Sequence, residues 1–96
     1  MSLMQSVKRG VAKAAEIGEK ARQVAKLKLA IATLESKLTD RYTALGQRCY
    51  ELHLAEAVRI FDDEKVKTLC QQITDILAEI KSKKWELEKV QAPDEV

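Results

Sequence analysis

The chain has 96 residues, a third of them charged, with a formal net charge of +2 and only four aromatic side chains. This length allows at most one small domain, and abundant alanine, leucine, lysine and glutamate with little glycine or proline is typical of long helices. No apolar run approaches the roughly 18 residues that a membrane span needs, and the N-terminus has no apolar signal-peptide core. We therefore expect a cytoplasmic protein without a membrane span.

Positive charge is concentrated at the start of the chain. Between Met1 and Lys28 seven basic residues stand against two acidic ones, a local balance of +5, which leaves −3 for the remainder. We predict that residues 1–27 form a basic amphipathic helical extension whose side chains contact a partner. The candidate contact residues of this extension are Lys8, Arg9, Lys13, Lys20 and Arg22.

Three kinds of partner would suit the basic extension: the same segment of another chain, an anionic lipid surface, or the phosphates of a nucleic acid. Its apolar face is rich in alanine and interrupted by Gly10 and Gly18, which disfavours insertion into lipid. It contains no aromatic residue among its bases, as nucleic-acid contact would favour. Self-association is therefore our first expectation, and binding to an anionic membrane or to nucleic acid is the alternative.

A seven-residue repeat of aliphatic side chains runs through the first half of the chain. It consists of Leu3, Gly10, Ile17, Val24, Ile31, Leu38, Leu45 and Leu52, of which only Gly10 is not aliphatic. Apolar spacings alternate between three and four, and a mean period of 3.5 predicts a helix that supercoils against a partner helix. The pattern predicts a helix from about residue 4 to residue 57.

The repeat then breaks, and we predict a turn at about residues 58–62. Asp62 or Asp63 suits the N-cap of a second helix, because an aspartate side chain can accept hydrogen bonds from the first free N–H groups. Glu64 suits the first turn of that helix, near the positive end of its dipole.

The second helix is predicted to run from about residue 63 to residue 91. Its apolar seam consists of Val66, Leu69, Ile73, Ile76, Ile80, Leu87 and Val90. Residues 28–91 then form an antiparallel helical hairpin, since a short connection makes consecutive helices antiparallel neighbours. Residues 92–96 are predicted to be a disordered tail.

The register of the hairpin can be predicted by matching apolar with apolar and base with acid across the interface. The predicted pairs are Leu45 with Ile76, Ala55 with Val66, Glu35 with Lys84, and Lys37 with Glu86.

The same register places a second apolar strip on one flank of the hairpin. Tyr42 and Cys49 of the first helix meet Leu77 and Cys70 of the second, and two hairpins that pack together would bury such a strip. Tyr42 and Leu77 are therefore candidate contact residues. The predicted fold is an all-α antiparallel coiled-coil helical hairpin with a long first helix, dimerising into a four-helix arrangement.

The sequence predicts neither catalysis nor a metal or cofactor site. Cys49 and Cys70 stand far apart without a C-x-x-C motif, which argues against zinc, and we expect both thiols to stay reduced. A two-helix rod offers no cleft for acid–base chemistry, so we expect no enzyme. Trp85 remains open to two interpretations: it contacts another copy or a partner, or its ring lies along its own helix under lysine side chains.

The stretch GEKARQVAKLKLAIATLESKLTDRYTALGQRCYEL, residues 18–52, resembles a group of small uncharacterised bacterial helical-hairpin proteins. The resemblance extends over about residues 7–90, and it implies the hairpin fold without implying an activity. Many of these proteins carry a zinc ribbon after the second helix. No such cysteines follow the second helix in this chain, so a metal role does not carry over.

These patterns predict a structural or protein-interaction module that forms a homo-oligomer, in first place a dimer, through coiled-coil packing. An unidentified protein partner is compatible with the same surfaces. The alternative function is a peripheral membrane or nucleic-acid binder that acts through residues 8–28.

Overall fold

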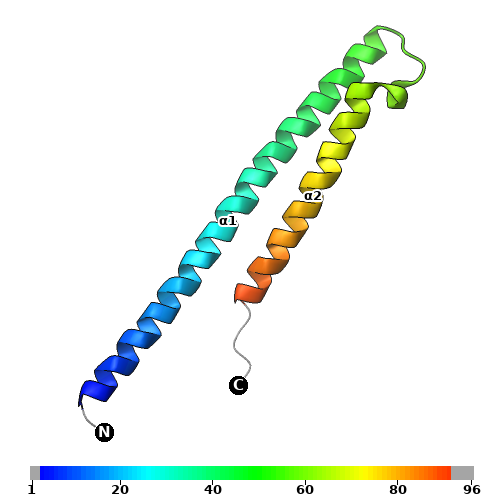
Figure 1. The fold of residues 1–96 in the computed structure, drawn as a ribbon. Coiled ribbons are helices and arrows are strands. Elements are labelled where there is room, and N and C mark those ends of the chain that lie inside the picture. The colour runs from blue at the N-terminus through cyan, green and yellow to red at the C-terminus, as the bar shows by residue number, and fades with distance from the viewer. Residues whose placement is uncertain (1–2, 92–96) are drawn as a thin grey trace.

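A computed structural model of the chain describes the backbone of residues 3–91 and the side chains of residues 17–91. Two long helices lie antiparallel and side by side, joined by a short connection at one end (Figure 1). Helix α1 spans Leu3–Leu54 and helix α2 spans Glu64–Gln91, with a short 3₁₀ helix, η1, at Ile60–Asp62 between them. The described residues contain no strand, so the predicted all-helical hairpin is confirmed.

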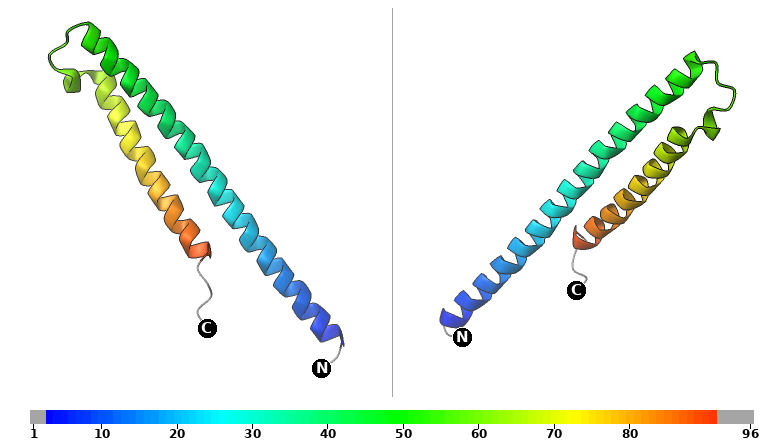
Figure 2. Two further views of the ribbon diagram at one scale, coloured as in Figure 1. Left: turned by 180° about the vertical axis from the view of Figure 1, so that it is seen from behind. Right: turned by 45° about the horizontal axis from the view of Figure 1, so that its top comes forward.

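The hairpin is a thin rod with extents of 81 × 21 × 15 Å. Because α1 has 52 residues and α2 only 28, the N-terminal part of α1 extends past the end of α2 (Figure 2). Gln91, the last residue of α2, lines a surface groove together with Lys28 of α1. Gln23, Lys26 and Leu27 still line a groove with Val90 of α2, so we call residues 3–22 of α1 the overhang. Within residues 3–91, neither helix has an apolar stretch long enough to cross a membrane.

The core is a single narrow seam between the two helices. Its buried side chains, each at most 8% exposed, are Ile31, Leu34, Val66, Ile73 and Ile80. Three of them recur every seven residues along α2, as the predicted seam requires. The remaining members of the α1 repeat within the hairpin, Leu38, Leu45 and Leu52, are half-buried.

Helix α1 is followed by a left-handed residue, Glu56, whose φ is 58°. The Ala57 N–H donates to the Leu52 carbonyl at 3.0 Å, and the Glu56 N–H donates to the His53 carbonyl at 3.1 Å. These are the two hydrogen bonds of a Schellman motif, in which glycine usually occupies the left-handed position. Because this motif closes the helix, α1 ends at Leu54 and not near residue 57.

Helix α2 begins at a capping aspartate. The Oδ2 atom of Asp63 accepts a hydrogen bond from the Val66 N–H at 3.1 Å, and the Asp63 carbonyl accepts one from the Lys67 N–H at 3.0 Å. Of the two predicted caps, Asp63 is therefore the one that is used. Glu64 follows in the first turn of α2, as predicted.

The predicted ion pair between Glu35 and Lys84 is confirmed, since Lys84 Nζ lies 3.8 Å from Glu35 Oε1. Ala55, in contrast, does not join the seam opposite Val66. It lies beyond the end of α1 and is exposed, whereas Val66 is only 1% exposed.

The predicted pairing of Lys37 with Glu86 is wrong. Glu86 lies 3.7 Å from Lys83 on its own helix, and it lines a groove together with Ala30 of α1. Ala30 lies about two helical turns before Lys37, which is too far along α1 for the predicted pair to form. On this flank, α2 is therefore shifted along α1 relative to the predicted register.

Candidate interaction surfaces

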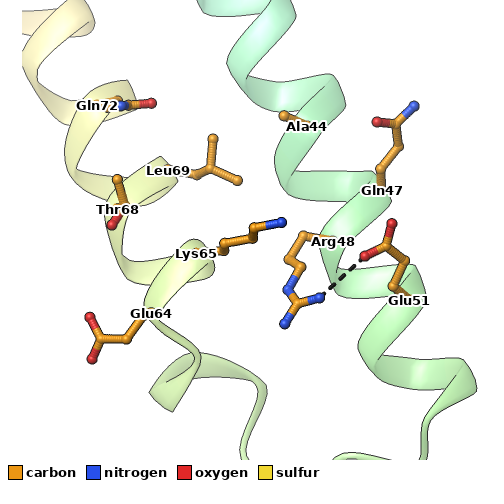
Figure 3. Close-up of a pocket in the computed structure, with 9 residues that line it drawn as sticks. All are labelled: Ala44, Gln47, Arg48, Glu51, Glu64, Lys65, Thr68, Leu69 and Gln72. Atoms are coloured by element: carbon orange, nitrogen blue, oxygen red, sulfur yellow. Dashed lines mark hydrogen bonds and ion pairs between the residues drawn. The ribbon is translucent and has the colours of Figure 1, made fainter.

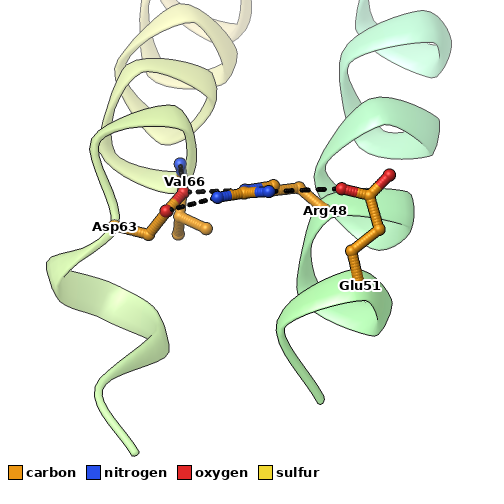
Figure 4. Close-up of polar contacts among 4 residues, drawn as sticks. All are labelled: Arg48, Glu51, Asp63 and Val66. Atoms are coloured by element: carbon orange, nitrogen blue, oxygen red, sulfur yellow. Dashed lines mark hydrogen bonds and ion pairs between the residues drawn. The ribbon is translucent and has the colours of Figure 1, made fainter. Parts of the chain in front are cut away.

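An ionic clamp joins α1 to the start of α2 (Figure 4). Arg48 of α1 donates two hydrogen bonds to Asp63, from Nε to Oδ2 at 3.0 Å and from Nη2 to Oδ1 at 2.8 Å. Its third nitrogen, Nη1, donates to Glu51 Oε2 at 3.2 Å. Because Asp63 also caps α2 through the Val66 N–H, one carboxylate ties together both helices. Sequence reasoning missed Arg48 in this role.

The clamp shifts the pKa values of both charged groups. Hydrogen bonds from the Arg48 guanidinium lower the pKa of Asp63 to about 2, although desolvation acts in the opposite direction. Hydrogen bonds to Asp63, and secondarily to Glu51, raise the pKa of Arg48 further above its usual range. Asp63 is therefore ionised at neutral pH and held by its partners, which suits a structural link between helices.

A shallow groove lies beside the clamp on one flank of the hairpin (Figure 3). It is lined by residues of both helices, namely Ala44, Gln47, Arg48, Glu51, Glu64, Lys65, Thr68, Leu69 and Gln72. Most of these side chains are polar, and the Arg48 guanidinium is already bound to Asp63 and Glu51. Such a lining offers hydrogen bonds to a partner surface. Among the residues with described side chains, no cluster of three His, Cys, Asp or Glu residues could hold a metal ion.

The flank that carries both cysteines is largely open. Tyr42 is 50% exposed and Leu77 is 45% exposed, while Cys49 is half-buried and Cys70 exposed. Both cysteines are free thiols. The Glu35–Lys84 pair borders this flank, so its apolar part is limited to the stretch of the hairpin nearest the connection.

Trp85 is 57% exposed and lies under a lysine of its own helix. The Nζ atom of Lys89 sits 3.8 Å from the centre of the Trp85 ring, within the range of a cation–π interaction. Trp85 and Lys89 are four residues apart, and this spacing places two side chains on the same face of a helix. The contact between them could therefore have been predicted from the sequence.

The predicted basic contact residues fall partly within the described side chains. Lys20 and Arg22 are both exposed on the overhang. Arg22 Nη1 lies 4.0 Å from Glu19 Oε2, an exposed pair that binds the arginine only weakly. The side chains of Lys8, Arg9 and Lys13 lie outside the described residues.

A long row on α1, which α2 leaves exposed, consists of uncharged residues, with Lys28 at its edge, three residues after Ala25 and four before Ala32. Its members recur every three or four residues, and all are exposed: Gly18, Ala21, Ala25, Leu29, Ala32, Ser36, Thr39, Thr43, Gly46, Tyr50 and Leu54. We call this row the uncharged face. Three of its side chains are large and more than 60% exposed: Leu29 at 69%, Tyr50 at 62% and Leu54 at 65%.

Sequence reasoning missed the uncharged face because it followed a period of 3.5 residues, which describes a supercoiled seam. A row along a straight helix surface has a period of 3.6, so a seven-residue template loses it after a few turns. Counting charges along each row of period 3.6 would have found it.

The connection between the helices presents a small apolar tip. Val58 is 96% exposed and Phe61 is 80% exposed. Arg59 and Asp62 flank them, with Arg59 Nη1 3.8 Å from Asp62 Oδ2. The described residues therefore expose apolar surface both along α1 and at the closed end of the hairpin.

Comparison of the chain with protein-family models, with curated proteins and with solved structures finds no match. The resemblance to bacterial helical-hairpin proteins stays a prediction. Function is therefore inferred from the faces, charges and packing of this chain.

Proposed function

We propose that the protein is a non-enzymatic structural or protein-interaction module that self-associates, with antiparallel coiled-coil hairpins packed into a dimeric four-helix arrangement. The observation that carries this proposal is the small core. Only five hydrophobic side chains are buried within the described part of the chain, whereas nine large hydrophobic side chains are exposed. A fold that leaves so many large apolar side chains in water gains stability when another surface covers them.

The surface area of the chain supports the same proposal. Its accessible surface is 8033 Å², whereas a compact globular protein of this mass exposes roughly 5,500 Å². The excess is larger than the roughly 800 Å² that each partner buries in a standard protein–protein interface. The hairpin can therefore bury a full interface and still remain an elongated rod.

Tyr42, Leu77 and Trp85 are candidate contact residues of this assembly, because each leaves a large side chain exposed. We propose the cytoplasm as its compartment, since Cys49 and Cys70 are free thiols and thiols there stay reduced.

A second candidate function, binding to an anionic membrane or to nucleic acid, is favoured by the exposed bases of the overhang. Lys20 and Arg22 are exposed there, and Lys26 and Lys28 are exposed on the part of α1 that follows. Co-sedimentation with anionic vesicles and with duplex DNA at low and high salt tests this function. Binding at low salt that disappears at high salt supports it, and no binding at low salt contradicts it.

Self-association is tested by sedimentation equilibrium of the full chain over a wide range of concentrations. The expected result is a species of twice the chain mass of 10.8 kDa that dissociates on dilution. A mass of one chain at every concentration would contradict the proposed function.

A further inference from the structure

The uncharged face is the longest exposed row on α1 without a charge. It runs from Gly18 to Leu54 through a chain in which a third of all residues are charged. Its large side chains, Leu29, Tyr50 and Leu54, are more exposed than Tyr42 and Leu77 on the cysteine flank. If the protein self-associates as proposed, this row offers the longest apolar contact to a second copy.

The charges around the uncharged face select the orientation of that second copy. Residues 17–28 carry four bases against one acid, a balance of +3, whereas residues 44–55 carry one base and one acid, a balance of zero. A second α1 packed in parallel would place the two basic segments side by side, where they repel each other. An antiparallel α1 centred on Ser36 places residues 17–28 beside the neutral residues 44–55 of the other copy, so the basic segments stay apart.

The sizes of the side chains on the face select the same orientation. Small residues, Gly18, Ala21 and Ala25, occupy its N-terminal end, and large ones, Tyr50 and Leu54, occupy its C-terminal end. Parallel packing would stack Tyr50 on Tyr50 and leave the glycine end empty. Antiparallel packing about the middle of the face places Tyr50 beside Ala21 and Leu54 beside Gly18, so that large side chains meet small ones.

We infer that the partner of the uncharged face is a second copy of this chain, whose α1 packs antiparallel with a two-fold axis near Ser36. This inference rests on the proposed self-association and adds the face and the orientation to it. It puts the uncharged face in place of Tyr42, Leu77 and Trp85 as the contact between copies, and leaves these three side chains to a further protein partner. The two α1 helices lie at the centre of the dimer, and each α2 lies on the outside. Because the two-fold axis makes the contact isologous, the assembly closes as a dimer.

Disulfide cross-linking of single-cysteine variants tests the inference. In a background of Cys49→Ala and Cys70→Ala, the variants are Ser36→Cys, Gly18→Cys and Leu54→Cys. The matched control is Ser82→Cys, because Ser82 is an exposed serine on α2. Each variant is oxidised at a concentration where the dimer forms, and covalent dimers are measured on non-reducing gels. Sedimentation equilibrium of the unoxidised variants reports the mass separately.

The expected result is that Ser36→Cys cross-links efficiently with itself. Gly18→Cys and Leu54→Cys do not cross-link alone, because each lies about 54 Å from its own copy in an antiparallel pair. A mixture of these two variants does cross-link. Cross-linking of each variant with itself would show a parallel pair and overturn the orientation.

Two further outcomes separate the inference from the proposed function. A dimer mass without cross-linking of Ser36→Cys above the Ser82→Cys control would overturn the face but leave self-association in place. A mass of one chain for every variant would overturn both.

A charge placed in the middle of the face gives an independent measurement. We expect Ala32→Glu to raise the dissociation constant of the dimer at least tenfold, since it would bring two carboxylates into an apolar contact. Ala78→Glu is the matched control, because Ala78 is an exposed alanine on α2. Equal dissociation constants for these two variants would overturn the inference.

Discussion

Arg48 of α1 and Asp63 at the start of α2 are joined by two side-chain hydrogen bonds, of 3.0 and 2.8 Å. The pair is a charged link between the two helices at the end where they are connected. The seam between the helices has only five buried side chains. The position of the start of α2 therefore depends on this polar contact as well as on apolar packing.

This link predicts how the stability of the hairpin depends on pH. The pKa of Asp63 falls from its ordinary value of 3.8 to about 2 in the folded chain. A lowered folded pKa means that the stabilisation is complete above the unfolded pKa and is lost as the pH falls toward the folded pKa. We therefore expect the contribution of Asp63 to disappear between about pH 4 and pH 2.

Thermal unfolding followed by circular dichroism at a series of pH values measures this effect. Asp63→Asn is the control, because asparagine can still cap α2 but cannot carry the charge. The difference in Tm between the natural chain and this variant should be constant near neutral pH and should shrink below pH 4. A difference that stays constant down to pH 2 would contradict the prediction.

The sequence predicts Asp62 or Asp63 as the cap of α2 but not the bond between Asp63 and Arg48, and the reason is physical. Arg48 lies three residues after Leu45 of the repeat, near the seam, where the pattern favours a charged head that extends outward to water. The partner of Arg48 depends on where α2 begins in space. The position of that start depends on the left-handed turn at Glu56. A glutamate gives no local signal for such a turn, whereas a glycine would have.

Periodicity predicts the hairpin itself well, because the seam is an apolar repeat and apolar repeats are visible in the sequence. Ile31, Val66 and Ile73 are buried as the repeat requires. The pairing on the flanks is less determined, because exposed charges such as Lys37 and Glu86 gain little from any one partner.

Glycine at position 56 should stabilise the hairpin. Glu56 adopts a φ of 58°, a left-handed conformation that costs a residue with a side chain roughly 1–2 kcal/mol. We expect Glu56→Gly to raise the free energy of unfolding by about 1 kcal/mol, measured by urea denaturation at a fixed chain concentration. Glu56→Ala removes the same charge but keeps the Cβ atom, and should give no such gain. Equal stabilities of the two variants would show that the turn carries no strain.

Two valines provide a matched measurement of the core. Val66 is 1% exposed in the seam, and Val58 is 96% exposed at the tip. Val66→Ala should lower the free energy of unfolding by about 2 kcal/mol, through lost burial and a residual cavity. Val58→Ala should change it by less than about 0.5 kcal/mol. Similar losses for both would mean that the tip is packed against another surface.

Trp85 is the only tryptophan of the chain, so its fluorescence reports a single site. With the α1 helices at the centre of the dimer, Trp85 stays on the outside under Lys89. We therefore expect the same emission maximum above and below the concentration at which the dimer dissociates. A shift to longer wavelength on dilution would instead place Trp85 in the contact between copies.

The salt dependence of dimerisation distinguishes the two orientations of α1. A parallel pair brings the basic residues 17–28 of the two copies together, and salt screens this repulsion, whereas an antiparallel pair keeps them apart. We expect the dissociation constant to change by less than about twofold between about 0.05 and about 0.5 M salt. Lys26→Glu should leave this slope unchanged, because Lys26 lies beside the uncharged Gly46 of the second copy in the antiparallel pair. Sedimentation equilibrium at several salt concentrations measures both slopes, and a dimer that tightens strongly with salt would show that the basic segments are in contact.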